Sequence, residues 1–401
     1  MRTFFGTLLY PFFLPGGALL GAVFLLLHQP NLLASLLPAQ GFILWIVIAA
    51  GLFLGWRFNR SRLFLAILAL ALAERLLALA PGSEGRSLLL SLVGVLLPLN
   101  LAVFSCLSER GLLTVRGLSR LVLLAVQVGG GIWLYQYRFA ETLALLETPL
   151  LNFPVFASVP LGQPVLAACG LSLAVMLFRF VRRPGVLEAG FFWALAAIAL
   201  ALAGPRAHWP LLFAGAGLIL VLGLLETFHF MAFRDELTGL PARRAMNEAL
   251  LKLGSRYTLA MVDIDFFKKF NDRHGHDVGD QVLRMVAARL SAVRGGGRAF
   301  RYGGEEFALL FPGCSVEEAL PALEQLRENI ELSEFSLRGR FRPRKKPARP
   351  PAKKSADKLR VTVSIGAAER GGTLKEPGQV LKAADQALYR AKKRGRNQVC
   401  R

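Results

Sequence analysis

The first 225 residues contain eight apolar segments, most of them close to the ~20 residues that a helix needs to cross a bilayer. They cover residues 4–27, 41–56, 63–80, 87–107, 118–137, 159–180, 186–203 and 209–225. Hydrophobic residues make up 54% of the chain, too many for a wholly soluble protein. The sequence therefore predicts an α-helical transmembrane bundle over residues 1–225. The segments at 41–56, 63–80 and 186–203 are short, so the count of about eight is approximate.

The connections between these segments predict the orientation of the bundle, because Lys and Arg are retained on the cytoplasmic side. Arginines follow the second, fourth and sixth segments: Arg57, Arg60, Arg62, Arg110, Arg116, Arg120, Arg179, Arg182 and Arg183. The alternate connections carry one arginine each or none. We therefore expect a multi-pass membrane protein with both termini in the cytoplasm. The first segment is long and lacks a small-residue cleavage site, so it is predicted to be retained.

The formal net charge of +21 comes partly from these arginines and partly from one basic stretch. Between residues 338 and 360 there are eleven Lys or Arg and one acid, Asp357, interspersed with prolines. Such a stretch cannot bury a core and predicts a solvated insertion, at about 338–358. It is a simple variable loop, a contact for anionic lipid headgroups, or, least favoured, a nucleic-acid site. We expect no nucleic acid partner. The four cysteines have no paired spacing and are predicted to be free thiols.

After residue 225 the pattern changes from membrane-like to soluble. From Leu225 onward the last apolar helix meets no Pro or Gly before Gly239, which predicts a connecting helix over 226–238 and a soluble domain over 239–401. Within that domain, periodicity predicts helices near 243–253, 280–290, 316–332 and 379–393, and strands at 259–262 and 361–365. Alternation of these elements indicates an α/β domain with an antiparallel hairpin.

The hairpin carries the most informative residues of the soluble domain. Residues 301–307 read Arg-Tyr-Gly-Gly-Glu-Glu-Phe, which predicts a tight turn with acids at its tip and with Gly303 and Gly304 at positive φ or in close approach to a ligand. Asp263 and Asp265 end the buried strand at 259–262. Carboxylates meeting at a sheet edge suit Mg²⁺, which accompanies nucleoside triphosphates, so the pattern favours phosphoryl transfer.

Five blocks of this domain, in order, resemble the GGDEF family of diguanylate cyclases in its Gly-Gly-Glu-Glu-Phe variant. The blocks lie at 235–240, 263–280, 303–307, 361–366 and 384–397. The resemblance covers under half of the chain. It implies the nucleotidyl-cyclase fold, which is related to polymerase palm domains.

The resemblance also implies roles for individual residues. Asp263 and Glu305 would be catalytic and would hold two Mg²⁺ ions (Mn²⁺ is possible) together with the carbonyl of Ile264. The guanine base would be read by Asn271 and Asp280. Substrate phosphates would be bound by Phe266, Phe267, Lys268, Gly304, Lys392 and Arg396. The signature comprises Gly303, Gly304, Glu305, Glu306 and Phe307, whereas His274 and His276 are predicted to be structural.

Two positions depart from the family pattern. The domain entrance, 241–244, reads Pro-Ala-Arg-Arg and lacks the family's asparagine. The inhibitory motif Arg-x-x-Asp retains Arg294, but Gly297 stands in place of the aspartate. The resemblance therefore predicts an inhibitory site that does not work.

The implied reaction condenses two GTP molecules, one in each subunit of a homodimer, to cyclic di-GMP and two pyrophosphates. The homodimer would form through the GGDEF domain and the membrane module, with the module setting the dimer geometry, and membrane lipids would be further partners. The alternative is a catalytically inactive nucleotide receptor or scaffold, which would be expected to lose a metal carboxylate or a signature glycine. A transporter would need charges inside the membrane, and only Glu74 and Arg75 come close. The outer loops are too short for a folded periplasmic sensor. The expected signal is therefore a stimulus within the bilayer or a small ligand among the helices.

Overall fold

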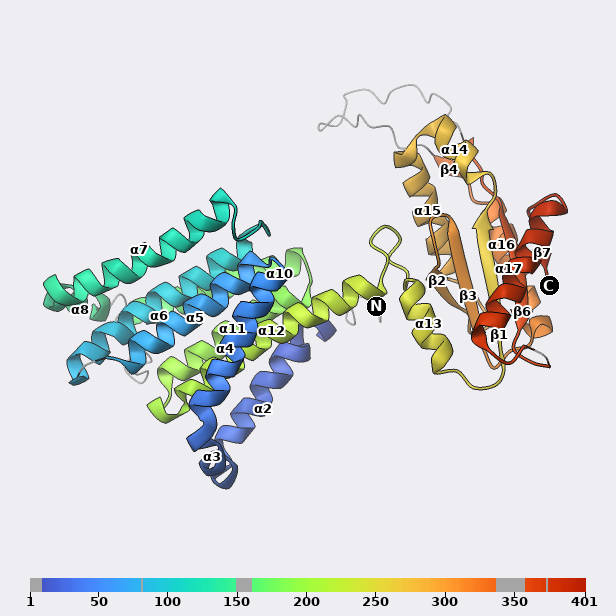
Figure 1. The fold of residues 1–401 in the computed structure, drawn as a ribbon. Coiled ribbons are helices and arrows are strands. Elements are labelled where there is room, and N and C mark those ends of the chain that lie inside the picture. The colour runs from blue at the N-terminus through green and yellow to red at the C-terminus, as the bar shows by residue number, and fades with distance from the viewer. Residues whose placement is uncertain (1–8, 81, 149–160, 337–357, 373) are drawn as a thin grey trace. The chain divides into compact units, whose positions relative to one another are not determined.

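The computed structural model describes residues 9–80, 82–148, 161–336, 358–372 and 374–401 (Figure 1). The chain divides into two compact units, Met1–Phe228 and His229–Arg401. The predicted basic insertion falls almost entirely outside the described residues, so its interpretations stay predictions.

The first unit is helical, as predicted. Its long helices are α2 (Ala18–Leu27), α4 (Gln40–Arg57), α5 (Ser61–Ala78), α6 (Gly82–Cys106), α7 (Val115–Tyr137), α10 (Gln163–Arg182), α11 (Val186–Ala203) and α12 (Trp209–Phe233). Shorter pieces are η1 (Phe13–Gly17), α3 (Pro30–Leu36), η2 (Leu37–Ala39), α8 (Phe139–Glu147) and η3 (Arg206–His208). Leucine, alanine and phenylalanine from these helices form one continuous core, which accounts for the apolar sequence.

Within the described residues, seven helical stretches are long and apolar enough to cross a membrane, one fewer than the eight segments predicted. The missing one is α5, which carries Arg62, Glu74 and Arg75 in its 18 residues. Yet α5 packs along both α4 and α6, and most of its length is buried. Its charges lower its apolarity, and its neighbours shield it from the surroundings of the bundle.

Several charged and polar side chains inside this unit are paired with one another. Arg62 is buried and donates to Glu188 on α11 (3.1 Å) and to the carbonyl of Phe104 (3.1 Å). On α6 and α7, Asn100 and Gln127 exchange two amide hydrogen bonds of 2.7 and 3.2 Å. Such pairing is needed because a buried polar group without a partner is costly.

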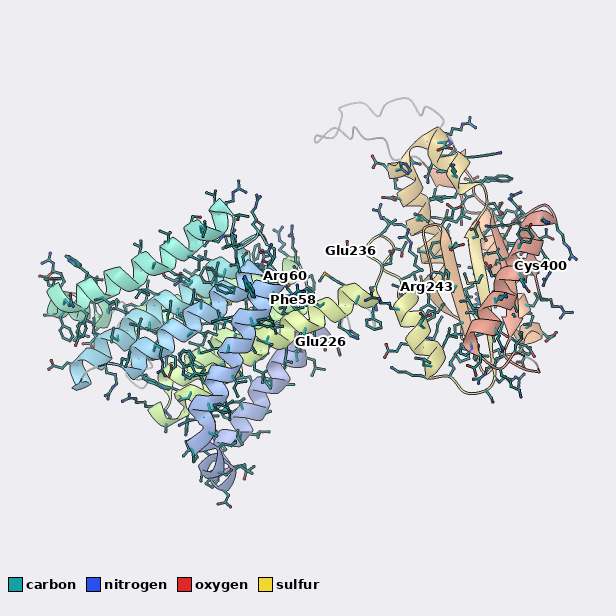
Figure 2. The ribbon with its side chains drawn as sticks, viewed as in Figure 1. Phe58, Arg60, Glu226, Glu236, Arg243 and Cys400 are labelled. Carbon is teal, nitrogen blue, oxygen red and sulfur yellow. The ribbon has the colours of Figure 1, made fainter. Side chains whose placement is uncertain are left out.

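The connection between α4 and α5 holds α12 near the end of the first unit. Figure 2 labels Phe58 and Arg60 on this connection. The Phe58 ring packs on Phe228 with centroids 4.7 Å apart, and the Arg60 guanidinium lies 5.0 Å from the same ring.

The second unit is built on a five-stranded sheet in the order β2-β3-β1-β6-β7. Its strands are β1 (Tyr257–Ile264), β2 (Arg298–Arg301), β3 (Glu306–Pro312), β6 (Val363–Glu369) and β7 (Val399–Cys400). Neighbours are antiparallel except β6 and β7, which are parallel. A two-stranded ribbon of β4 (Phe335–Ser336) and β5 (Lys358–Leu359) stands apart from this sheet.

Helices cover both faces of the sheet. Residues of α15 (His276–Leu290) and α16 (Val316–Glu331) share one core with Val262 of β1 and Leu309 of β3. Residues of α13 (Arg243–Leu251) and α17 (Pro377–Lys393) share the other with Leu259 and Leu310. Because side chains alternate along a strand and β1 is buried on both faces, its sequence is apolar without interruption from Leu259 to Val262. The predicted α/β architecture with an antiparallel hairpin is confirmed (Figure 1).

Some elements differ from the predictions. Helix α12 ends at Phe233, not at residue 238, because the Asp235 carboxylate accepts bonds from the Thr238 N–H (2.8 Å) and hydroxyl (2.6 Å) and holds a turn there. Helix α15 begins at His276, so Gly279 lies inside its first turns. A short helix that periodicity did not indicate, α14 (Phe267–His274), follows β1 directly.

Candidate active site

The site is built where the central strand β1 ends. Asp263 is opposite Glu306 on β3 and Ser364 on β6, so it lies between two paired strands, and its side chain is only 6% exposed. The ammonium group of Lys392, from α17, lies 2.9 Å from Asp263 Oδ2. Burial raises the pKa of Asp263, and the hydrogen bond from Lys392 opposes that rise. The lysine therefore acts as a counter-ion to a carboxylate that burial destabilises.

The hairpin brings Glu305 to the same place. Its loop runs over residues 302–305, between the end of β2 at Arg301 and the start of β3 at Glu306. Burial and then the charge of Asp263 raise the pKa of Glu305. Within the described part of the chain, no hydrogen bond or ion pair holds the Glu305 side chain. Two carboxylates thus converge, and one of them has no partner from the protein.

The expectation that Gly303 and Gly304 adopt positive φ is wrong, because neither is among the glycines with such a backbone. The loop is longer than a two-residue turn and needs no left-handed residue. Instead, a Cβ on Gly303 would approach Glu306 Oε2 to 2.9 Å, whereas a Cβ on Gly304 would meet nothing within 4 Å. Gly304 is exposed, so its backbone is open to a ligand.

Arg301 ties this loop to the start of the domain, a role that sequence reasoning missed. Its guanidinium donates to the carbonyls of Gly303 (3.2 Å) and Gly304 (2.8 Å) and to Asp235 Oδ1 (2.6 Å). Burial alone would raise the pKa of Asp235, but hydrogen bonds from Thr238 and Arg301 lower it below its ordinary value. Asp235 and Arg301 lie in two of the sequence motifs described above, yet they are 66 positions apart and no spacing rule pairs them.

The oxygen atoms at this edge of the sheet are the candidate ligands of a divalent cation. No group of three or more His, Cys, Asp or Glu side chains suited to a metal occurs among the described residues. The site offers two converging carboxylates, Asp263 and Glu305, and the adjacent backbone carbonyl of Ile264. Since Mg²⁺ is usually held by one or two carboxylates with water and substrate phosphates completing the shell, this set fits Mg²⁺ bound together with a nucleotide.

Asp265 does not face the pair of carboxylates as a free ligand. It is buried, and its two oxygens accept hydrogen bonds from the hydroxyls of Ser364 (2.7 Å) and Thr362 (2.7 Å) and from the N–H of Asn397 (3.1 Å). Its acceptors are already engaged by three groups of the protein, which come from the start of β6 and from the segment after α17.

The predicted guanine-binding residues lie at the junction of α14 and α15. Asn271 Oδ1 is buried without a hydrogen-bond partner among the described residues, and it lies against Gly279, where a Cβ would collide with it. Asp280 follows Gly279 and is half-buried. An unsatisfied buried acceptor is costly, so a change that let the Asn271 amide accept a hydrogen bond would be favourable.

The predicted phosphate-binding residues surround the start of α14. Phe266 precedes this helix with φ of 55°, so the first N–H groups of α14 lack intrahelical acceptors. The guanidinium of Arg396 stacks on the Phe266 ring, 4.2 Å from its centroid. Lys268 is exposed on the first turn. Cations and open N–H groups here can bind an anion.

The region predicted to have lost product inhibition is a tight turn. Gly295 and Gly296 have φ of 70° and 75°, and Arg294 is exposed. A Cβ on Gly297 would lie 2.7 Å from the Phe311 ring and 2.8 Å from Val293. No side chain fits at residue 297 without movement of its neighbours.

Comparison with known proteins places the second unit in a family. Residues 232–398 match the family described as "Diguanylate cyclase, GGDEF domain". The response regulator PleD of Caulobacter vibrioides is 40% identical over 178 residues, which cover 42% of this chain and 36% of PleD. The diguanylate cyclase DgcM of Escherichia coli is 36% identical over 184 residues, covering 44% of this chain and 40% of DgcM.

A crystal structure of the coiled coil and GGDEF domain of DgcB from Caulobacter crescentus, in complex with c-di-GMP, is 31% identical. The match covers 49% of this chain and 99% of the DgcB chain, with a TM-score of 0.42. The chain spans less than half the length of the two curated relatives above. Residues 232–398 of this chain therefore form a GGDEF domain of the diguanylate cyclase family.

Proposed function

We propose that this protein is a membrane-bound diguanylate cyclase, which condenses two GTP molecules into cyclic di-GMP and two pyrophosphates. The observation that carries the proposal is the convergence of Asp263 and Glu305 beside Lys392 in a GGDEF domain. A degenerate receptor would not be expected to keep these groups together.

The chain's own residues would bind and orient the nucleotide. Asn271 and Asp280 would accept hydrogen bonds from guanine, and Arg396 and Lys392 would bind the triphosphate. Lys392 would have to move from Asp263 toward the phosphates. Mg²⁺, held by Asp263, Glu305 and the Ile264 carbonyl, would neutralise phosphate charge and polarise the 3′-hydroxyl of the facing nucleotide.

One subunit holds only one nucleotide, so the reaction requires a homodimer with two facing sites. The apolar helices of the first unit would place the protein in the bacterial inner membrane with the GGDEF domain in the cytoplasm. Contact with membrane lipids and control by a signal in the bilayer belong to this proposal.

The direct test incubates the purified full chain with GTP and Mg²⁺ and identifies the product by mass. Cyclic di-GMP and pyrophosphate in a ratio of one to two is the expected result. For the variant Glu305→Gln, which should make no product, the matched control is Glu328→Gln, because Glu328 is 60% exposed on α16 and outside the site. Tight GTP binding without turnover would instead favour the receptor.

A further inference from the structure

We propose that Asp265 is a positioning residue, which fixes the Arg396 guanidinium for triphosphate binding by holding the chain segment that carries it. The proposal rests on the proposed function and adds a residue that touches neither metal nor substrate. Its starting point is that Asp265 is buried, next to a carboxylate site, yet has all its bonds within the protein.

The segment after α17 has an unusual backbone. Gly395, Arg396 and Asn397 have φ of 113°, 65° and 45° in succession. Glycine adopts positive φ easily, but for arginine it is sterically unfavourable, and asparagine tolerates it only as an isolated residue. Something must therefore hold this conformation.

The Arg396 N–H donates to the Ala391 carbonyl (3.0 Å), and hydrogen bonds to Asn397 supply the rest of that restraint. The Asn397 N–H donates to Asp265 Oδ2 (3.1 Å), while its side chain bridges to Arg327 (3.0 Å) and Glu331 (2.9 Å) on α16. The N–H bond is the one that reaches the active-site end of β1. A hydrogen bond to a carboxylate is stronger than one to a neutral acceptor.

The consequence appears one residue earlier, at Arg396. Its guanidinium stacks on Phe266, which follows Asp265 directly and is itself left-handed and 54% exposed. Asp265 thus sits between the two halves of the stack: it is covalently joined to Phe266 and hydrogen-bonded to the neighbour of Arg396. Releasing the Asn397 N–H would let the arginine leave the ring and would add an ordering cost to phosphate binding.

The two oxygens of Asp265 allow a matched comparison. Thr362 shares Oδ2 with Asn397, whereas Ser364 contacts only Oδ1. Thr362→Val and Ser364→Ala each remove one hydroxyl, but only the first disturbs the oxygen that holds Asn397. A general loss of packing would weaken nucleotide binding to a similar extent in the two variants.

The experiment measures binding of GTP and of GMP, which lacks the β- and γ-phosphates, to the purified full chain. Asp265→Asn should weaken GTP binding about tenfold, the effect of losing one charge-assisted hydrogen bond, and leave GMP binding within about twofold. Adding Arg396→Ala to Asp265→Asn should weaken GTP binding no further than Arg396→Ala alone, since groups that act as one unit are not additive. Thr362→Val should weaken GTP binding about threefold, and Ser364→Ala should weaken it less.

Asp385→Asn, on the exposed face of α17, is the charge-matched control. If Asp265→Asn fails to fold, the comparison of Thr362→Val with Ser364→Ala decides the matter. Equal losses for GTP and GMP, or additive effects with Arg396→Ala, would overturn the positioning role while leaving cyclase activity standing. A wild-type chain that binds neither nucleotide overturns both this inference and the proposed function.

Discussion

Buried charge is handled in opposite ways in the two units of this protein. In the helical unit Arg62 and Glu188 neutralise each other, at 3.1 Å, within a tightly packed set of helices. In the GGDEF domain Glu305 has no partner among the described residues, and burial and Asp263 raise its pKa. Removing one partner of an internally paired charge destabilises the fold, whereas charge left uncompensated is available to a ligand.

The sharpest way to break this contrast is Glu305→Gln in the full chain. Loss of the carboxylate should lower the rate of cyclic di-GMP synthesis at least a thousandfold, about 4 kcal/mol of transition-state stabilisation. A folded-state pKa above the ordinary value means that ionisation of Glu305 costs stability as the pH rises past that ordinary value. At pH 7 the neutral variant should therefore melt at the same temperature or higher. More than a tenth of the wild-type rate, or clear destabilisation, contradicts the assignment.

Arg62→Leu tests the other half of the contrast. Breaking this buried pair leaves Glu188 with only the more distant Arg179 guanidinium, at 3.9 Å, and the expected loss is about 3 kcal/mol of unfolding free energy. Thermal unfolding of the detergent-solubilised chain measures it. The double variant Arg62→Leu, Glu188→Leu should recover part of the loss because the carboxylate left by the single variant is removed as well. An equally unstable double variant would show that packing, and not charge, is at stake.

Asp280→Ser should relax base selection. Guanine offers donors at N1 and at its 2-amino group, and adenine offers an acceptor at N1, so a carboxylate at Asp280 is left unpaired by ATP. We expect preference for GTP over ATP to fall about tenfold to a hundredfold, seen as mixed cyclic product from equimolar nucleotides. Comparable mixed product from the wild-type chain would refute this role.

Asp235→Asn should weaken the link between the domain's start and the hairpin. Because the pKa of Asp235 is lowered in the folded protein, the stability that its carboxylate contributes is fully present above the ordinary pKa of 3.8. This stability is lost as the pH falls through the pKa of the folded state. The variant should be less stable than wild type at pH 7 by roughly 1 to 2 kcal/mol, scaled for a partly exposed pair. Denaturant unfolding over a pH series checks this, and a difference that persists unchanged at pH 3 would contradict it.

The smallest expected effect concerns feedback. Added cyclic di-GMP at low micromolar concentration should leave the initial rate nearly unchanged, because Arg294 has no aspartate partner at residue 297. Gly297→Asp should not restore inhibition, since its Cβ would press on Phe311 and Val293. The measurement is initial rate against added product. Strong inhibition that Arg294→Ala abolishes would reveal a working site.

The sequence alone was sufficient for the class of each unit. The apolar segments predicted the helices because helix length and membrane-like composition are local properties. The continuous run of β1 and the hairpin signature predicted the α/β domain, and the motif spacing placed Asp263 and Glu305 at a common site. Boundaries were less well predicted: the end of α12 depends on Asp235 and Thr238, and the backbone of Gly303 and Gly304 on a loop held by Arg301.

What only the tertiary structure decided are the partners of the charged groups. Nothing in the order of residues indicates that Arg301 reaches Asp235, that Lys392 neutralises Asp263, or that Asp265 holds Asn397 rather than a metal. Each pair joins segments 66 or more positions apart. Such contacts depend on which strands are neighbours in the sheet and how the helices cover it. Local propensity and periodicity determine the elements, but only their packing brings these side chains within hydrogen-bonding distance.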